Sequence, residues 1–405
     1  MSIIWQGLRW QCSPIMCFAM GDPATDQAPP TVAVEVAGNR LTLLADGPGR
    51  LEALIGLIEG ARESLRVLYY MFMDDSSGTR VREALIAAAD RGVKVSLLVD
   101  GFGSTANAEF FRPLTESKVA FCVFSPRYGR RYLLRNHQKL ALADGSKVII
   151  GGFNISDDYF RTSSGAWRDL GLEVEGPGAS GLTIYFDGLF EWARNPRARI
   201  RDLRRLLHQH SVTEGKLHWL FGGPTRRLSP WARAVRRDMR GARRLDIVAA
   251  YFAPSLGILR RIAGVARLGG RARLVTASRS DNNATVAAAR STYWWLLRRG
   301  VEIFEYQPAK LHTKLFVVDD AVHIGSANFD MRSLFLNLEM MLRVDDPAFA
   351  AEMRRFVDGE IAASRQITLE SHRRERTPVN RLKWAFAWFV VAVADYRIAR
   401  RFSLR

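Results

Sequence analysis

The chain is poor in cysteine and in long apolar runs. Its 405 residues include three cysteines, Cys12, Cys17 and Cys122, too few for a disulfide framework or a multi-cysteine metal site. The longest apolar run, WAFAWFVVAVA at 384–394, is about half of the roughly 20 residues that a membrane-spanning helix needs. Polar residues interrupt the first 20 positions, which do not match a signal peptide. The sequence therefore predicts neither a disulfide-rich secreted protein nor a membrane-spanning one.

Lysine is also scarce, although the chain is strongly basic. Lys and Arg number 59 against 41 acidic residues, a net charge of +18, and only eight of the 59 are lysines. The basic excess indicates a polyanionic partner: nucleic acid, an anionic membrane surface or a phosphorylated substrate. Codon bias is the alternative explanation. It would account for the preference for arginine over lysine, but not for the excess of basic over acidic residues. Lysines at matching positions of a repeat would therefore be informative.

The chain repeats itself. Six runs read as buried strands, three in each half: 65–73, 93–100 and 119–126, then 245–254, 271–278 and 301–308. Helical patterns at 79–91 and 255–268 separate the first two strands of each half. Strands that alternate with helices predict parallel pairing, with helices covering the sheet. The expected fold is a duplicated α/β protein, and we interpret 194–210 as the connection between its halves or a solvated basic surface.

Each half carries the same chemical cassette after its third strand. The copies are His137-Gln138-Lys139, four residues, Asp144 and Gly151-Gly152-Phe153-Asn154, then His312-Thr313-Lys314, four residues, Asp319 and Gly325-Ser326-Ala327-Asn328. A His-x-Lys on a strand places both side chains on one face, because the side-chain period is two. Small residues before each Asn let a ligand approach the backbone closely. Each half thus offers an imidazole, an ammonium and an amide toward a common point.

These groups suit a phosphate. Lysine supplies charge, asparagine supplies N–H donors, and histidine supplies a nucleophilic or acid–base nitrogen. Two of only seven histidines and two of only eight lysines occupy matching positions in the two cassettes. The alternative, that these histidines are ordinary core residues, is therefore a poor one. Asp144 and Asp319 lie five residues beyond their lysines, so a structural hydrogen-bonding role is as probable for them as a catalytic one.

The paired cassettes resemble the signature of the phospholipase D superfamily, His-x-Lys-x4-Asp followed by a Gly-rich Asn segment. Flanking segments resemble bacterial cardiolipin synthases in particular: 155–160, 167–177, 251–255 and 328–340, within a similarity that runs from about residue 40 to about residue 370. The resemblance implies an α/β/α sandwich of two pseudo-twofold-related halves, each with a mixed, mainly parallel sheet. Two copies in one chain exclude the single-copy homodimeric nucleases, and the missing amino-terminal pair of spanning helices implies the shorter, peripheral branch.

The resemblance also implies a two-step phosphatidyl transfer with no metal and no cofactor. One histidine attacks the phosphodiester and forms a phosphohistidine, and the other protonates the leaving alcohol and then deprotonates the incoming one. By analogy His137 is the nucleophile and His312 the general acid and base, although the pseudo-symmetry leaves this assignment open. Four side chains would meet the phosphoryl charge: Lys139, Lys314, Asn154 and Asn328.

Each histidine should have an acidic partner that fixes its tautomer. In the second half the family pattern points to Glu339, 27 residues after His312. In the first half it points to Asp169, with Glu173 as the rival partner for His137. An ordinary surface or salt-bridged carboxylate is the alternative for each.

The expected organisation has four parts: a disordered lead-in at 1–39, two phospholipase D-like halves at 40–210 and 211–370, and a membrane-interaction segment at 371–405. The last segment combines aromatic and basic residues, which is typical of an interfacial helix. A helix packed on the protein's own core is the alternative. The resemblance implies phosphatidylglycerol and an anionic membrane surface as partners, a second phospholipid or alcohol as acceptor, and no nucleic acid. The implied location is the bacterial cytoplasmic membrane, peripheral and on its cytoplasmic face.

Two other functions remain open. A phosphodiesterase of this superfamily, acting on phospholipid or nucleic acid, would fit the arginine excess equally well. Against a nuclease, the sequence has no basic stripe interleaved with aromatic residues of the kind that stacks bases. A membrane-binding protein on an inactive scaffold is disfavoured because both cassettes are complete.

Overall fold

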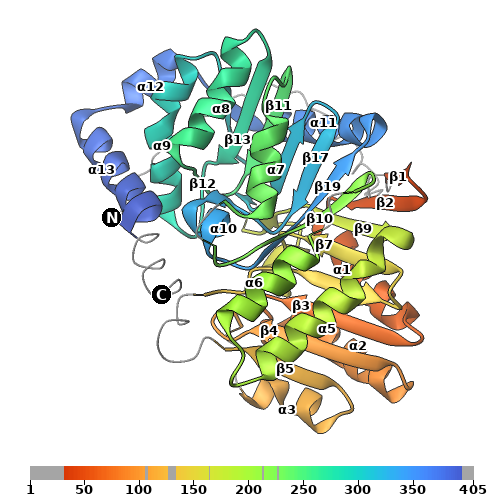
Figure 1. The fold of residues 1–405 in the computed structure, drawn as a ribbon. Helices are drawn as coiled ribbons and strands as arrows, with labels where there is room; N and C mark the ends of the chain where they lie inside the picture. Colours follow the sequence, from red (N-terminus) through yellow and green to blue (C-terminus); the bar gives the residue numbers. More distant parts are fainter. Residues whose placement is uncertain are drawn as a thin grey trace, which may run out of the picture. The chain divides into compact units, whose positions relative to one another are not determined.

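Two eight-stranded sheets form the framework of the residues that the computed structural model describes: 32–104, 108–125, 134–163, 165–211, 214–225 and 228–394 (Figure 1). The first sheet has, in spatial order, β1 (Ala33–Val36), β2 (Asn39–Leu44), β9 (Gly171–Glu175), β7 (Lys147–Gly151), β6 (Leu140–Ala143), β3 (Ser64–Tyr69), β4 (Lys94–Asp100) and β5 (Ala120–Phe124). The second has β10 (Leu217–Gly222), β19 (Glu339–Asp345), β17 (Ala321–Gly325), β16 (Lys314–Val318), β11 (Arg244–Ala249), β13 (Arg271–Ala277), β14 (Glu302–Tyr306) and β20 (Ser364–Ile367).

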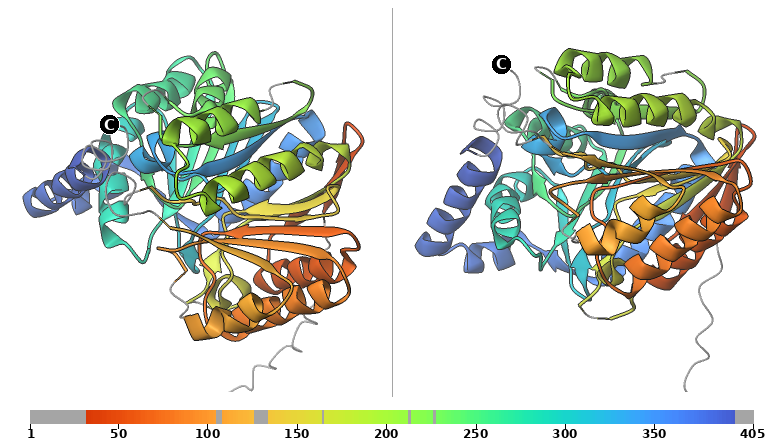
Figure 2. Two further views of the ribbon diagram at one scale, coloured as in Figure 1. Left: turned by 60° about the horizontal axis from the view of Figure 1, so that its bottom comes forward. Right: turned by 90° about the horizontal axis from the view of Figure 1, so that it is seen from below.

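Helices pack on both faces of each sheet. The first half has α1 (Gly47–Gly60), α2 (Ser76–Asp90), α3 (Ala108–Glu116) and α4 (Asp157–Phe160), followed by the short turn η1 (Pro177–Ala179), α5 (Gly181–Arg194) and α6 (Ile200–Gln209). The second has α7 (Pro230–Asp238), α8 (Leu256–Arg267), α9 (Asn283–Leu297), α10 (Met331–Phe335), α11 (Pro347–Ala362), α12 (Leu369–Glu375), α13 (Pro378–Trp388) and the π-helical turn η2 (Phe389–Ala394). Figure 2 shows α1 and α2 on the face of the first sheet that is turned away from α5.

The inner faces of the two sheets share one hydrophobic core. Alternate residues of a strand point to opposite faces, so Leu140 and Leu142 join this shared core while Ala141 and Ala143 join the core under α1 and α2. Strands of the second sheet contribute to the same shared core, together with α5, α6 and α11. The segment 194–210 is therefore not a bare connection: within α6, Leu203 and Leu207 are buried in this core.

The pairing corrects the expectation of mainly parallel sheets. Both large sheets are mixed. Among the described strands of these two sheets, parallel pairing is confined to β3–β4–β5 and β11–β13–β14, and the other pairings between their strands are antiparallel. The reason is local. Each cassette folds as a hairpin, β6–β7 or β16–β17, across a tight turn at Asp144 or Asp319. Both aspartates adopt a left-handed conformation, with φ of 50° and 48°, which Asp tolerates better than most residues.

Two details bear on the predicted ends of the chain. The lead-in expected at 1–39 overlaps the strand β1, and residues 1–31 lie outside the described residues. Within the described part of the chain, none of the helices has the length and apolar character needed to cross a membrane.

Candidate active site

Two short strand pairings join the halves immediately before each cassette histidine. The strand β15 (Lys310–Leu311) pairs with β8 (Trp167–Arg168) of the first half, and Asn136 forms an isolated bridge with Leu338 of the second. The backbone N–H of His312 then donates to the carbonyl of Arg168 at 2.7 Å, and that of His137 donates to the carbonyl of Leu338 at 2.9 Å. Each histidine is therefore held by the main chain of the opposite half.

The acidic partners are crossed in the same way. His137 Nδ1 lies 3.1 Å from Glu339 Oε2, and His312 Nδ1 lies 2.6 Å from Asp169 Oδ2. Each predicted carboxylate thus lies beside the histidine of the other half, which differs from the expected pairing within a half. The rival Glu173 lies 3.1 Å from Lys147 instead.

Glu339 is held by two serines that the sequence did not single out as functional. The hydroxyls of Ser326 and Ser333 donate to its two carboxylate oxygens at 2.5 and 2.8 Å. Burial alone would raise the pKa of Glu339, but the interaction and hydrogen bond with His137, followed by the charge of Lys139, outweigh burial and lower it. Ser326 belongs to the small-residue run of the cassette, whereas Ser333 carried no signal. Glu339 is thus a fixed anion that orients His137.

Asp169 is completely buried and is supported by Arg50, a residue that sequence reasoning also missed. The Arg50 guanidinium, 1% exposed, donates to the carbonyls of Asp169 at 2.6 Å and Tyr159 at 2.7 Å. Burial opposes the charge of Asp169, but Lys314 and then His312 outweigh it, so the pKa of Asp169 lies below its ordinary value. Asp169 therefore orients His312 as an anion.

The two cassette lysines are buried beside the histidines. Lys139 Nζ donates to the carbonyl of His137 at 2.6 Å, and Lys314 Nζ lies 2.7 Å from His312 Nδ1. Burial lowers the pKa of Lys139 to about 7 and that of Lys314 to about 8, although Glu339 and Asp169 raise both values. The charge of Lys314 also lowers the pKa of Lys139, which shows that the two cassettes form one electrostatic unit. Two buried ammonium groups that their carboxylates do not fully stabilise favour an added anion between them.

The histidines have unequal surroundings. The ring of His312 contacts those of Tyr159 at 5.2 Å, Trp167 at 5.1 Å and Tyr251 at 6.5 Å, whereas His137 contacts Tyr70 at 4.9 Å. Burial, and then the charge of the neighbouring lysine, lowers the pKa of both imidazoles, that of His312 to about 3. Both rings are therefore neutral near pH 7 in the free protein. Because each Nδ1 faces a carboxylate, Nε2 is the nitrogen left to meet a substrate.

The two cassette asparagines also differ. Asn154 accepts from the N–H of Met71 at 3.3 Å and donates to the hydroxyl of Tyr159 at 3.0 Å. Asn328 is 4% exposed, and its Oδ1 has no hydrogen-bond partner among the described residues. Residues 126–133, which precede the first cassette, lie outside the described residues. Asp281 accepts a hydrogen bond from the hydroxyl of Tyr251 at 2.7 Å, and the ring of Tyr251 contacts that of His312.

Residues 54–177 and 237–359 each match the family described as "Cardiolipin synthase, PLD-like domain". The chain belongs to this family. The cardiolipin synthase A of Pseudomonas entomophila is 31% identical over 349 residues, which cover 84% of this chain and 72% of that protein. The cardiolipin synthase A of Pseudomonas aeruginosa is 30% identical over 351 residues, covering 84% and 71%.

A solved structure gives an independent likeness of fold. The phosphatidylserine synthase of Haemophilus influenzae superimposes with a TM-score of 0.71 at 14% identity, over 91% of this chain and 96% of that one. At this identity the likeness concerns the fold alone. It confirms the α/β architecture, and the two segments that match the cardiolipin synthase family confirm its duplication.

The aspartate of each cardiolipin synthase cassette lies away from the histidines, which corrects its placement among the catalytic residues. Asp144 lies at the far end of β6 and accepts from the backbone N–H groups of Arg62, Glu63 and Ser64 at 2.8–3.0 Å. Asp319 accepts equivalently from the N–H groups of Arg243 and Arg244. The signature aspartate therefore connects the cassette hairpin to the start of the neighbouring strand. Its contacts match the structural hydrogen-bonding role, which was the alternative to a catalytic one.

Replacing Asp144 by asparagine should lower the free energy of unfolding by about 1–2 kcal/mol, because neutral acceptors bind the three amides less well. Turnover should change by no more than about twofold. Burial alone would raise the pKa of Asp144, but hydrogen bonds from the amides of Ser64, Arg62 and Glu63 lower it. The stabilisation is therefore present above the ordinary pKa of about 4 and lost as the pH falls through the lower folded value. Urea unfolding between pH 3 and 7 measures this, and Asp319→Asn is the matched variant. A tenfold loss of turnover at unchanged stability would contradict this structural role.

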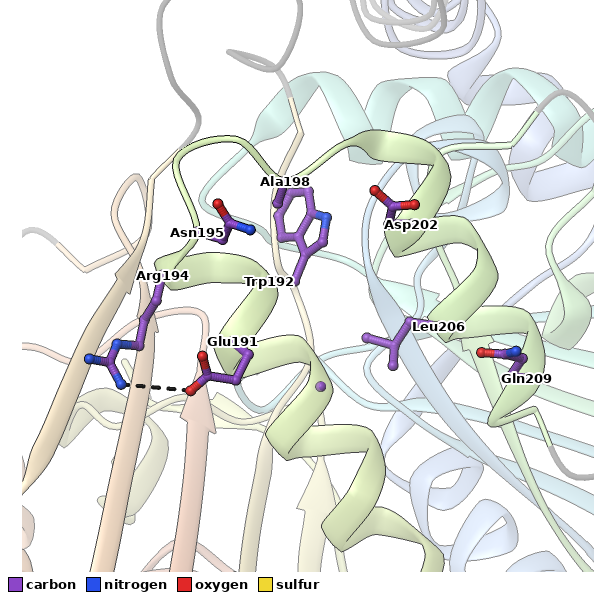
Figure 3. Close-up of a pocket in the computed structure, with 9 residues that line it drawn as sticks. Glu191, Trp192, Arg194, Asn195, Ala198, Asp202, Leu206 and Gln209 are labelled. Carbon is purple, nitrogen blue, oxygen red and sulfur yellow. Dashed lines mark ion pairs between the residues drawn. The ribbon is translucent and has the colours of Figure 1, made fainter.

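A hollow elsewhere in the first half has no part in this site. It occupies about 670 Å³ between α5 and α6, and Trp192, Asp202 and Gln209 are among its lining residues (Figure 3). None of the cassette residues of the cardiolipin synthase family lines it. The position of the active site is thus given by the convergence of the two cassettes.

Proposed function

We propose that the protein is a cardiolipin synthase that converts two molecules of phosphatidylglycerol into cardiolipin and glycerol. The observation that carries this proposal is the crossed arrangement, in which each cassette histidine is oriented by a carboxylate of the other half beside two buried lysines. Family membership and relatives named cardiolipin synthase A supply the substrate class.

In the first step, Nε2 of His137 attacks the phosphorus of one phosphatidylglycerol and the P–O bond to glycerol breaks. The proton on Nε2 of His312 passes to the leaving oxygen, which leaves as glycerol, and a phosphatidyl-histidine remains. His312 must be protonated for this step, and the negative charge of the bound diester raises its pKa toward that state. Lys139 and Lys314 stabilise the charge on the phosphoryl oxygens.

In the second step, the neutral Nε2 of His312 takes the proton from a hydroxyl of the second phosphatidylglycerol. That oxygen attacks the phosphorus, the P–N bond to His137 breaks, and cardiolipin is released with both histidines restored. Water in place of the second lipid would yield phosphatidic acid, so the choice of acceptor separates a synthase from a hydrolase. The pseudo-symmetric geometry permits the two histidines to exchange roles.

The activity is tested with purified protein in mixed micelles that contain phosphatidylglycerol alone. Cardiolipin together with free glycerol in equal amounts is the expected outcome. Phosphatidic acid without cardiolipin would instead identify a phospholipid hydrolase. DNA cleavage that disappears in a His137→Ala variant would identify a nuclease and overturn the proposal.

The carboxy-terminal helix α13 supports attachment to a membrane surface. Its inner face packs against α9 through the buried Trp384 and Ala387. This contact agrees with the alternative considered for this segment, a helix packed on the protein's own core. The outer face of α13, continued by the first residue of η2, exposes an apolar stripe at the spacing of one helix face: Val379, Leu382, Phe386 and Phe389, exposed by 75, 74, 66 and 52%. Residues 395–405 lie outside the described residues. We infer that this stripe enters the boundary of an anionic bilayer while the basic chain attracts its headgroups, a peripheral attachment to the cytoplasmic face of the bacterial membrane.

Replacing Leu382 and Phe386 together by serine should lower partitioning onto anionic vesicles by about 100-fold or more. The reason is that two large apolar side chains each contribute about 1.5 kcal/mol or more when buried in the membrane boundary. Sedimentation with vesicles gives the partition coefficient. The matched control replaces two other exposed apolar residues, Ile184 and Leu268, which are exposed by 67 and 79% and lie outside α13. Equal losses in both double variants would show that α13 has no special role.

A further inference from the structure

A second hollow lies between α9, α12 and α13, which are side by side in Figure 1 and in contact. It encloses about 450 Å³. We call it the arginine hollow after three of its lining residues, and the full set is Arg290, Ser291, His372, Arg376, Pro378, Arg381, Leu382, Trp384 and Ala385. None of these residues belongs to either cassette, so the hollow is separate from the active site.

The hollow carries an excess of positive charge. Arg290 binds Glu305 through two hydrogen bonds of 2.8 and 2.9 Å, and Arg365 bridges Glu305 and Glu375 at 3.1 and 3.0 Å. These two arginines and two glutamates neutralise one another.

The other two lining arginines are left over from this network. Arg376 lies 4.8 Å above the ring of Trp294, and neither Arg376 nor Arg381 forms an ion pair within the described part of the chain. Two guanidinium groups without a carboxylate therefore face one small space, and guanidinium groups bind phosphate through paired N–H donors.

A buried imidazole points to the same kind of ligand. His372 is 2% exposed and stacks on Trp384 with ring centroids 5.2 Å apart. Its ring nitrogens form no hydrogen bond with the described residues. They are nevertheless not completely shielded from solvent, and because His372 lines the hollow, we take this opening to lie on the side of the hollow. Burial, and then the charge of Arg376, lowers the pKa of His372. An anion in the hollow would reverse the second effect and would give the imidazole a partner.

Apart from Ser291, the rest of the lining is mainly apolar. Pro378, Leu382 and Trp384 form this part, and Leu382 also belongs to the exposed stripe of α13. The hollow therefore joins a cationic interior to an apolar rim on the helix that we assign to the bilayer boundary. A phosphate attached to hydrocarbon has this same polarity.

We propose that the arginine hollow binds the headgroup phosphate of an anionic phospholipid at a second site, distinct from the catalytic one. Arg376 and Arg381 bind the phosphate oxygens, His372 forms a further hydrogen bond, and the lipid's apolar part lies along Leu382. This site goes beyond the proposed function, because it requires only an anionic lipid and no particular reaction at the cassettes.

The test titrates the full chain with dihexanoyl phosphatidylserine below its micelle concentration, followed by the ring NMR signals of His372. A His372→Gln variant assigns these signals among the seven histidines. We expect saturable binding that shifts the His372 signals, with an affinity at least about tenfold lower in the double variant Arg376→Gln and Arg381→Gln. The control replaces Arg260 and Arg373, two exposed arginines outside the hollow, by glutamine and should bind within about twofold of the parent.

Three outcomes would overturn the proposal: no shift at His372, equal losses in the two double variants, or inorganic phosphate binding as tightly as the lipid. The last would make the hollow a site for free phosphate. Turnover of micellar phosphatidylglycerol, measured in parallel, is expected to persist in the double variant. If the parent chain showed no turnover, the proposed function would be refuted. The lipid-binding measurement would still test the second site, because it does not depend on turnover.

Discussion

Replacing either His137 or His312 by alanine is expected to lower the rate of cardiolipin formation by at least about 10⁴-fold. One variant loses the nucleophile and the other loses the group that moves the proton, so neither can complete both steps. Cardiolipin formed from labelled phosphatidylglycerol measures the loss. The control is His208→Ala, which replaces an exposed histidine of α6 outside the site and should keep full activity.

A donor with nitrophenol as its leaving group separates the two roles, because nitrophenolate leaves without a proton. The His312→Ala variant should then release about one equivalent of nitrophenolate in a burst and retain a phosphatidyl-histidine, whereas His137→Ala should give no burst. The opposite result would assign His312 as the nucleophile. More than about one tenth of the parent activity in either variant would contradict the two-histidine mechanism.

Replacing Glu339 by glutamine, or Asp169 by asparagine, is expected to lower turnover by about 10²–10⁴-fold, as for other histidines whose orienting carboxylate is replaced by an amide. The crossed geometry adds a sharper expectation. Glu339→Gln should change the NMR titration of His137, and Asp169→Asn that of His312.

Glu173→Gln provides the matched control, because Glu173 neighbours Lys147 and should leave turnover within about twofold of the parent. If Glu339→Gln changed the titration of His312 and left that of His137 unchanged, the result would support pairing within each half. It would show that the crossed contacts are not those that orient the rings.

The repeated cassettes allowed the duplicated α/β fold to be predicted, because strand and helix patterns recur at matching offsets in both halves. The direction of strand pairing was less accessible. The prediction extended the βα periodicity to the whole sheet, whereas Asp144-Gly145 is itself a signal for a tight turn between antiparallel strands. In the second half Asp319-Asp320 gives no comparable signal, and only the matching position in the repeat points to the hairpin.

Sequence spacing predicted His137, Lys139 and their counterparts, together with Glu339 and Asp169, as site residues, and the structure brings these residues together. Their pairing could not be predicted, since a spacing of 27 residues describes one chain segment and not the way in which two halves dock. Arg50 was missed for a similar reason: a single arginine in a chain with 51 of them carries no signal until its burial is known. The sequence left two alternatives for the carboxy-terminal helix, packing on the protein's core or binding to a membrane. Its buried inner face and its exposed apolar outer face are compatible with both.

The crossed histidine–carboxylate pairs have a consequence for how the chain matures. Neither half holds an oriented histidine by itself, because the carboxylate that orients each histidine belongs to the other half. Catalytic competence is therefore expected only once both halves have docked, and one folded half alone is not a partial enzyme.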